Sequence, residues 1–287
     1  MTRYAKPADL NDALALLAAD RWKILAGGTD FYPALGARPL RENVLDINGL
    51  SALRGISTTG SHVVIGARTS WSDIIRHRLP PAFDCLKEAA REVGSVQIQN
   101  TGTVAGNLCN ASPAADGVPA LMALDAEVEL RSAAGARHLP LAEFIRGNRK
   151  TALAPGELMT AIRVPTSATA GHSAFVKLGA RRYLVISIAM AAARIVLAEG
   201  RIAEAALAVG SCSAVAKRLP ALEAALVGQK ADGELGERIE ASHLAELTPI
   251  GDVRGSAEYR LVAAREILAR AICKAVGGNR PEGRIAA

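Results

Sequence analysis

The pattern of hydrophobic positions predicts short strands and helices over the first half of the chain. An Ala/Leu-rich helix is expected over residues 10–19, with Asp9 as its N-cap, and another helix over 82–93. Further on, a short helix over 118–125 precedes a strand pair over 127–139. Residues 22–30 predict a short buried strand that runs into a Gly-Gly turn, and further strands are expected over 44–47, 52–57 and 62–67, separated by glycine-containing breaks.

The pattern changes after residues 164–173, a stretch rich in Pro, Ser, Thr and Gly where a domain boundary is expected. Strands are then predicted over 173–180, 185–198 and 202–210. The last two are joined at Glu199-Gly200, a two-residue hairpin signal. Helices are predicted over 214–227, 236–246 and 256–276. The expected fold class is α+β, with a larger mixed domain followed by a three-stranded sheet covered by helices.

Composition and charge exclude several classes of protein. Half of the residues are hydrophobic, which is enough for full cores. The net charge of +6 comes from scattered basic residues without interleaved aromatics, which argues against nucleic-acid binding. No signal peptide is recognisable, and no apolar run reaches the roughly 18 residues of a membrane span. Four cysteines (Cys85, Cys109, Cys212 and Cys273) lack the spacing of a metal site. The sequence therefore predicts a cytoplasmic protein with no metal of its own.

Two adjacent glycines after the first predicted strand form one candidate ligand-binding site, in Ala26-Gly27-Gly28-Thr29-Asp30. Glycine accepts positive φ and has no Cβ, so backbone N–H groups can close around a phosphate. A helix starting near Asp30 would add the positive end of its dipole. A plain tight turn is the alternative, and the segment is not the GxGxxG pattern of Rossmann folds.

A second candidate site is the segment QIQNTGTVAGNLCNASPAAD at residues 97–116, within a stretch from 94 to 119 that lacks periodicity. This pattern predicts a long loop that can present many hydrogen-bond donors to an extended polar ligand. Asp116 would place its carboxylate on a sugar hydroxyl. A solvated loop is the alternative, but Ile98, Val104 and Leu108 among the polar groups favour ligand binding.

These motifs carry a family resemblance. AGGTD, the 97–116 segment, FVKLGARRYLVISIA at 175–189 and DVRGSAEYR at 252–260 occur in the order found in the FAD-binding medium subunits of the xanthine dehydrogenase and carbon monoxide dehydrogenase family. The chain resembles these molybdenum hydroxylase subunits over nearly its whole length.

The resemblance implies a vanillyl-alcohol-oxidase-like FAD-binding domain over residues 1–168, followed by the family's C-terminal domain over 169–287. The first domain would have two lobes, at about 1–55 and 56–168, with FAD lying between the parts. The cofactor is expected to be noncovalent, because neither glycine-rich segment contains a His or Cys placed as a covalent tether.

The resemblance also implies individual cofactor contacts. The first pyrophosphate loop would comprise Ile24, Leu25, Ala26, Gly27, Gly28, Thr29, Asp30 and Phe31, and the second Thr103, Val104, Ala105, Gly106 and Asn107. Asn110 and Asp116 would contact the sugar and phosphate portion, and Met159 or Leu158 would pack near the flavin. Lys177 would approach the isoalloxazine and favour its reduced, anionic form; a solvated strand lysine is the alternative. No catalytic residue is assigned.

Two positions depart from the family pattern. Ala105 stands where the second loop usually has glycine, which is tolerable if its φ is negative. Gln99 stands where the family often has Arg, which removes a possible charged contact.

The resemblance implies a heteromeric enzyme, with a dimer of heterotrimers as the expected assembly. A large subunit would hold the molybdenum–pterin cofactor, and a small subunit would carry two [2Fe–2S] clusters that pass electrons to FAD in this chain and onward to an external acceptor. The absence of clustered cysteines agrees with clusters on a partner. Alternatives from other classes are a stand-alone flavin-dependent reductase on the same fold and a nucleotide-binding assembly factor.

Overall fold

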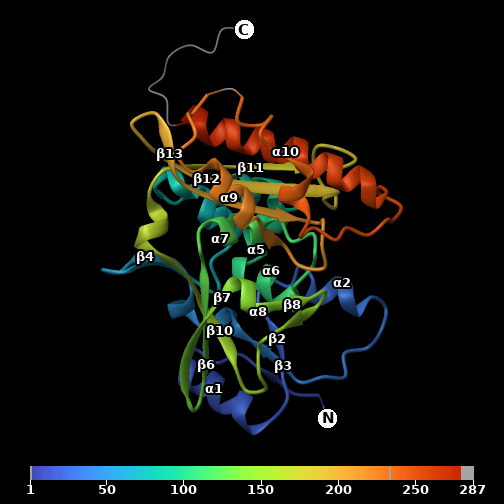
Figure 1. Ribbon diagram of the computed structural model, residues 1–287. Helices are drawn as coiled ribbons and strands as arrows, with labels where there is room; N and C mark the ends of the chain where they lie inside the picture. Colours follow the sequence, from blue (N-terminus) through green and yellow to red (C-terminus); the bar gives the residue numbers. More distant parts are fainter. Residues whose placement is uncertain (1, 233, 279–287) are drawn as a thin grey trace.

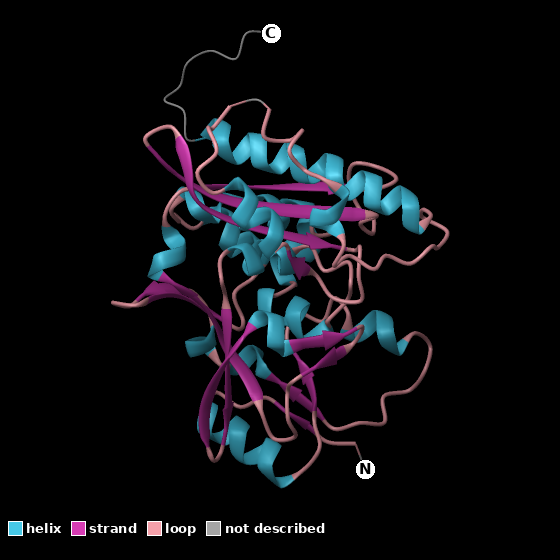
Figure 2. Ribbon diagram, viewed as in Figure 1, coloured by secondary structure: helices cyan, strands magenta, loops and turns pink. Residues whose placement is uncertain are grey.

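The computed structural model describes residues 2–232 and 234–278 and contains three main sheets that follow one another along the chain (Figure 1). Their strands come from residues 4–46, 56–165 and 172–218. Figure 2 shows helices between the last sheet and the other two, and a long helix on the outer face of the last sheet. The architecture is α+β, as expected. Among the described helices, none is long and apolar enough to cross a membrane.

The first sheet is small and parallel, with strand order β1-β3-β2. Its elements are β1 (Tyr4–Ala5), α1 (Leu10–Ala19), β2 (Lys23–Leu25), α2 (Phe31–Leu35) and β3 (Val44–Asp46). The predicted N-cap of α1 is confirmed, since the Asp9 carboxylate accepts a hydrogen bond from the Asn11 amide. Leu14 and Leu17 on the buried face of α1 pack with Leu45 of β3. The short strand predicted within 22–30 is confirmed, since β2 ends at Leu25 and the chain turns at the glycines that follow.

The second sheet is antiparallel, with order β4-β5-β10-β6-β7. Its strands are β4 (Ile56–Thr58), β5 (His62–Gly66), β6 (Glu127–Ser132), β7 (Gly135–Pro140) and β10 (Leu158–Pro165). Sequence patterning did not find β10. The reason is its central position, because burial on both faces removes the alternation of apolar and polar residues that marks a half-exposed strand.

Helices fill the space between the second and third sheets (Figure 1). They are α3 (Trp71–Arg76), α4 (Asp84–Glu92), α5 (Val96–Thr101), α6 (Val104–Asn110), α7 (Gly117–Ala123) and α8 (Leu141–Phe144), with a small hairpin of β8 (Ile145–Gly147) and β9 (Lys150–Thr151) beside α8. The prediction of a long loop over 94–119 is therefore wrong. Ser95 and Thr103 cap two of its short helices, and tertiary burial stabilises turns too short to show periodicity.

The third sheet has order β11-β12-β13-β14 and is antiparallel. Its elements are β11 (His172–Leu178), β12 (Ala189–Ala198), β13 (Arg201–Gly210), β14 (Lys217–Arg218), α9 (Pro220–Leu226) and α10 (Ala257–Gly278). The predicted three strands are present, and two-residue β14 extends them. Glu199 and Gly200 both have positive φ, as the predicted hairpin turn requires.

The two remaining helix predictions in this region were too long. The segment over 214–227 begins with β14 before α9, and the segment over 236–246 contains only a 3₁₀ turn at Ala241–Leu244. Part of the C-terminal tail, from residue 279, lies outside the described residues.

Buried arginines bind the third sheet to the helices beneath it. The Arg194 side chain, from β12, is 5% exposed and donates to the Ala123 carbonyl at 3.0 Å and to Asp125 at 3.2 Å. Arg218 of β14 donates to the other oxygen of the Asp125 carboxylate at 2.5 Å. Asp125 directly follows the end of α7, so one carboxylate connects two strands of the third sheet to the helical layer.

A second arginine anchor lies at the start of α10. Arg260 is buried and donates to the carbonyls of Ile188 (2.5 Å) and Ser211 (3.1 Å) and to the Asp252 carboxylate (2.7 Å). Hydrogen bonds from the Arg254 amide and from Arg260 lower the pKa of Asp252 to about 2. The anchor therefore joins the 252–260 segment to both long strands of the third sheet.

This anchor should make the stability of the protein depend on pH in acid. The folded pKa of Asp252, about 2, lies below the roughly 3.9 of an unfolded aspartate, so its contribution is complete above about pH 4 and is lost as the pH falls through about 2. Asp252→Asn should lower the free energy of unfolding at pH 6 and flatten its decline in acid, as measured by urea denaturation. Glu266→Gln, which removes an exposed pair with Arg270, is the control and should change stability by less than about 0.5 kcal/mol. Equal acid dependence in the Asp252→Asn variant and the wild type would contradict this account.

Candidate functional site

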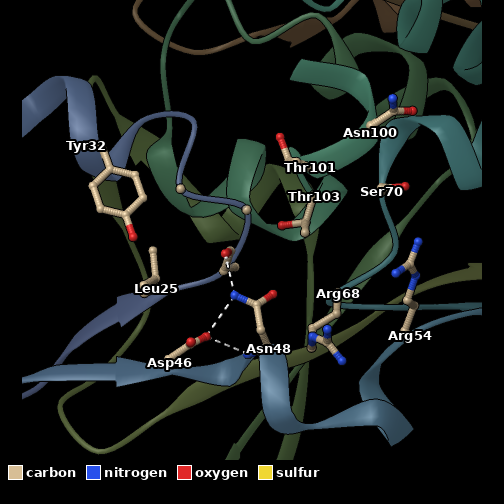
Figure 3. Close-up of a pocket in the computed structure, with 13 residues that line it drawn as sticks. Leu25, Tyr32, Asp46, Asn48, Arg54, Arg68, Ser70, Asn100, Thr101 and Thr103 are labelled. Atoms are coloured by element: carbon tan, nitrogen blue, oxygen red, sulfur yellow. Dashed lines mark hydrogen bonds between the residues drawn. The ribbon is translucent and has the colours of Figure 1, made fainter. Parts of the chain in front are cut away.

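A pocket of about 390 Å³ lies where the first sheet meets the second sheet and its helices (Figure 3). Its walls come from four stretches of chain that are distant in sequence. The lining residues are Leu25, Ala26, Gly27, Gly28, Tyr32, Asp46, Asn48, Arg54, Arg68, Ser70, Asn100, Thr101 and Thr103.

The two glycines of the first candidate motif are required by two different constraints. A Cβ on Gly27 would lie 2.0 Å from the Thr101 carbonyl oxygen, so the backbones of two separate segments touch here. Gly28 has φ +75°, a conformation that costs other residues about 1–2 kcal/mol. This turn therefore packs against α5 backbone to backbone and leaves amide groups at the pocket wall.

A side-chain support under this turn was missed by sequence analysis. The Asn48 side-chain Nδ2 donates to the Ala26 carbonyl at 2.8 Å and to Asp46 at 2.7 Å. The Tyr4 hydroxyl donates to the second Asp46 oxygen at 2.6 Å. Burial alone would raise the pKa of Asp46, but the hydrogen bonds from Tyr4 and Asn48 lower it, so the carboxylate stays ionised. The sequence signal was the Asp46-Ile47-Asn48 segment, with one polar residue at the end of a buried strand and another two residues later.

The opposite wall is built on helix caps. The Thr103 hydroxyl accepts from the Gly106 amide at 3.0 Å, which starts α6, and Ser70 forms a capping box at the start of α3. The Val104 amide donates to the Thr69 carbonyl at 3.0 Å, which joins the two caps. Because α2, α3 and α6 have only five, six and seven residues, we attribute the wall's polarity to these local groups rather than to helix dipoles.

The two departures from the family pattern have clear structural consequences. Ala105 lies inside α6 and is absent from the residues with positive φ, so the methyl group causes no backbone strain. Gln99 is buried and donates to the Arg91 carbonyl at 3.1 Å, so its side chain is directed into the protein.

Trp71 packs between a segment next to the pocket and a segment next to a buried ion pair. Its indole packs against both Gly102 and Gly117, where a Cβ on Gly117 would lie 2.4 Å from the ring. Beside Gly117, the Asp116 carboxylate accepts from Lys177 at 2.7 Å and from Ser187 at 2.6 Å. The side chains of Asp116 and Lys177 are 9% and 6% exposed. Burial raises the pKa of Asp116, an effect that Lys177 and Ser187 oppose.

This pair answers a question that the sequence left open. Lys177 is not the solvated strand lysine of the alternative interpretation, because it is buried against Asp116 and also donates to the Glu92 carbonyl at 3.4 Å. The Asp116 side chain makes no capping hydrogen bond to α7. Ser187 is a further polar partner that sequence reasoning did not identify.

The remaining predicted residues fall into three groups. Leu25, Ala26, Gly27, Gly28 and Thr103 line the pocket. Adjoining them in the chain, but outside the lining, are Ile24, Thr29, Asp30, Phe31, Val104, Ala105, Gly106 and Asn107. Asn110 accepts from Arg149, while Met159 and Leu158 are buried in the hydrophobic cores at 2% and 3% exposure.

One buried polar atom of the pocket lining fits a bound polar ligand. The Arg68 Nε lacks a hydrogen-bond partner within the described part of the chain. Orphaned buried groups of this kind are rare in folded proteins and call for a partner. Together with the glycine turn, which a Cβ would obstruct, Arg68 makes the pocket suitable for an extended polar ligand with negative charge.

Comparisons with known proteins agree with this geometry. The model of the FAD binding domain in molybdopterin dehydrogenase matches residues 1–167, and that of the CO dehydrogenase flavoprotein C-terminal domain matches residues 174–275. The carbon monoxide dehydrogenase medium chain of Afipia carboxidovorans is 34% identical, with 95% of this chain and 96% of that protein covered. The glyceraldehyde dehydrogenase medium chain of Sulfolobus acidocaldarius is 33% identical, with 90% and 92% covered. A solved structure of CO dehydrogenase from Oligotropha carboxidovorans aligns with a TM-score of 0.90 at 30% identity, covering 96% of this chain and 98% of that one.

The fold and the matched domains define a flavoprotein with an FAD-binding domain. The chain belongs to the molybdenum hydroxylase family that includes xanthine dehydrogenase and CO dehydrogenase, as an FAD-binding medium subunit.

The support under the glycine turn predicts an effect on cofactor binding. Asn48→Ala removes the hydrogen bonds to Ala26 and Asp46, so the turn loses its fixed position. We expect FAD affinity to fall about tenfold, the equivalent of roughly one to two hydrogen bonds, in a fluorescence titration of the folded chain. Asn43→Ala removes exposed amide hydrogen bonds in the same lobe and should bind FAD like the wild type. Unchanged affinity in Asn48→Ala would show that the support is dispensable.

The buried ion pair predicts strong coupling between its two residues. Lys177→Met leaves the Asp116 carboxylate buried without its cation and should destabilise the chain by about 3–5 kcal/mol. Adding Asp116→Asn removes the stranded charge, so the double variant should recover part of that loss. A double-mutant cycle by urea denaturation measures the coupling, which we expect to be about 1–3 kcal/mol. Additive effects would mean that the two residues act independently.

Proposed function

We propose that this chain holds FAD noncovalently and relays electrons through it. The electrons would come from [2Fe–2S] clusters on a small partner subunit, which receive them from a molybdenum–pterin centre on a large partner subunit. They would leave to an external acceptor. The observation that carries the proposal is the Gly27-to-Thr101 contact, which joins the two motif segments at one polar pocket.

The proposed binding residues act through different groups. The backbone from Ile24 to Phe31 would hold the diphosphate from one side, and Thr103 to Asn107 from the other. Asn110 and Asp116 would contact the sugar and phosphate portion, Met159 would pack near the ring, and Lys177 would approach it. The buried Lys177–Asp116 pair supports a role for Lys177 as a fixed positive charge. Bound FAD supplies the redox chemistry, because it accepts and releases electrons singly or in pairs.

The chain division that fits this role is an FAD-binding domain over 1–168, with lobes of about 1–55 and 56–168, and a C-terminal domain over 169–287. In support of this division, the strands of each main sheet all lie within one of these three ranges. We further propose a cytoplasmic dimer of heterotrimers. The relatives named as medium chains of carbon monoxide and glyceraldehyde dehydrogenases support the multi-subunit part of this proposal.

Reconstitution tests the relay. The isolated FAD-loaded chain should be reduced by dithionite but not by any candidate hydroxylation substrate, because it would lack the centre that takes electrons from substrate. Adding the large and small subunits should allow the substrate to reduce the flavin. The reduction is measured as a loss of flavin absorbance. Acid precipitation should release FAD into the supernatant if the cofactor is noncovalent.

Other outcomes favour the alternatives. Substrate-dependent bleaching of the lone chain would support a stand-alone flavin-dependent reductase. A colourless chain that binds its partners only transiently would support a nucleotide-binding assembly factor. Flavin that stays with the acid precipitate would contradict noncovalent binding.

A further inference from the structure

Arg68 is a cation at the pocket wall with no carboxylate partner among the residues that the structure describes. It lies between β5 and α3, and its Nη1 donates to the Leu50 carbonyl at 2.9 Å. Its Nε is buried without a hydrogen-bond partner in the described residues. Figure 3 shows Arg68 and Arg54 across the pocket from Leu25 and Tyr32.

The other charged side chains of the lining are already satisfied. Arg54 donates to Asp73 through two nitrogens, at 2.9 and 3.1 Å. Asp46 accepts from Tyr4 and Asn48. The positive charge of Arg68 therefore remains available to a ligand in this pocket.

The surroundings of Arg68 disfavour an unpaired cation. Burial and the nearby Arg54 lower the pKa of Arg68 more than the Asp46 carboxylate raises it, although a guanidinium stays protonated in proteins. A buried or half-buried charge is stabilised when an opposite charge is brought to hydrogen-bonding distance. An anion bound in the pocket would pair with the Arg68 charge. A phosphate suits this role, because its oxygens match the geometry of a guanidinium.

We propose that Arg68 donates to a phosphate oxygen of the bound dinucleotide and supplies the charged part of diphosphate recognition. This inference rests on the proposed FAD site and adds to it a residue outside both glycine-containing motifs. The Gly27–Gly28 turn offers neutral backbone donors, which provide shape and direction. Arg68 adds a full charge on another wall of the same pocket, so binding becomes dependent on ionic strength.

The simplest competing role for Arg68 is structural. Its hydrogen bond to the Leu50 carbonyl could serve only to hold the chain between the first two sheets. A structural role predicts a loss of folding stability and a loss of FAD affinity that does not respond to salt. A charge contact predicts an effect on FAD that is largest at low salt and is partly restored by lysine.

The test measures FAD dissociation constants and urea unfolding for the full-length apo chain as wild type, Arg68→Met, Arg68→Lys and Arg163→Met. Titrations are run at about 50 mM and about 500 mM salt. Arg163→Met is the matched control, since it removes a half-buried arginine of the same sheet that pairs with Glu127 outside the pocket.

We expect Arg68→Met to weaken FAD binding about ten- to a hundredfold at low salt, as for the loss of a charge-assisted hydrogen bond, and to reduce the salt dependence. Arg68→Lys should retain affinity between those of the wild type and Arg68→Met, and Arg163→Met should match the wild type. Wild-type affinity in folded Arg68→Met, or an equal loss at both salt concentrations without rescue by lysine, would overturn the inference. Failure of the wild-type chain to bind FAD would instead reject the proposed function itself.

Discussion

The close approach of Gly27 to the Thr101 carbonyl is the constraint on which the site depends. No side chain fits between these backbones, since even a Cβ would lie 2.0 Å from the oxygen. The contact sets the first, parallel sheet against the helices of the second lobe and defines one edge of the pocket. Asn48, Asp46 and Tyr4 hold the turn from below through hydrogen bonds of 2.6–2.8 Å. A backbone contact supported in this way is rigid, so its amide groups are positioned before a ligand arrives.

Charge is handled differently at the pocket and at the buried ion pair. Asp116 and Lys177 neutralise each other, and Ser187 donates to the other Asp116 oxygen, as a buried pair requires. At the pocket, the Arg68 Nε has no hydrogen-bond partner in the described residues. The ion pair is thus satisfied by its own partners, while the pocket retains a cation without a carboxylate partner in the described residues.

The third sheet is joined to the rest of the molecule by arginines rather than by apolar packing alone. Arg194 and Arg218 share Asp125 beneath the sheet, and Arg260 ties α10 to two of its strands. Lys177 and Ser187 bring residues of this part of the chain to Asp116 in the helical layer. In a medium subunit of this family, such links make the position of Lys177 depend on how the C-terminal domain is attached.

Local patterns in the sequence determined the α1 cap, the Glu199-Gly200 hairpin, the long C-terminal helix and the need for glycine at 28, because these features depend on neighbouring residues. The motif segments and their order were sufficient to identify the family. Tertiary structure alone decided the rest. Strand β10 lacks alternation because both faces are buried, and α5 and α6 are too short to show helical periodicity without the layers that pack on them. The Asn48 support, the packing of Trp71 on Gly102 and Gly117, and the unpaired Arg68 arise from residues far apart in the chain, and spacing along a single sequence carries no information about such distances.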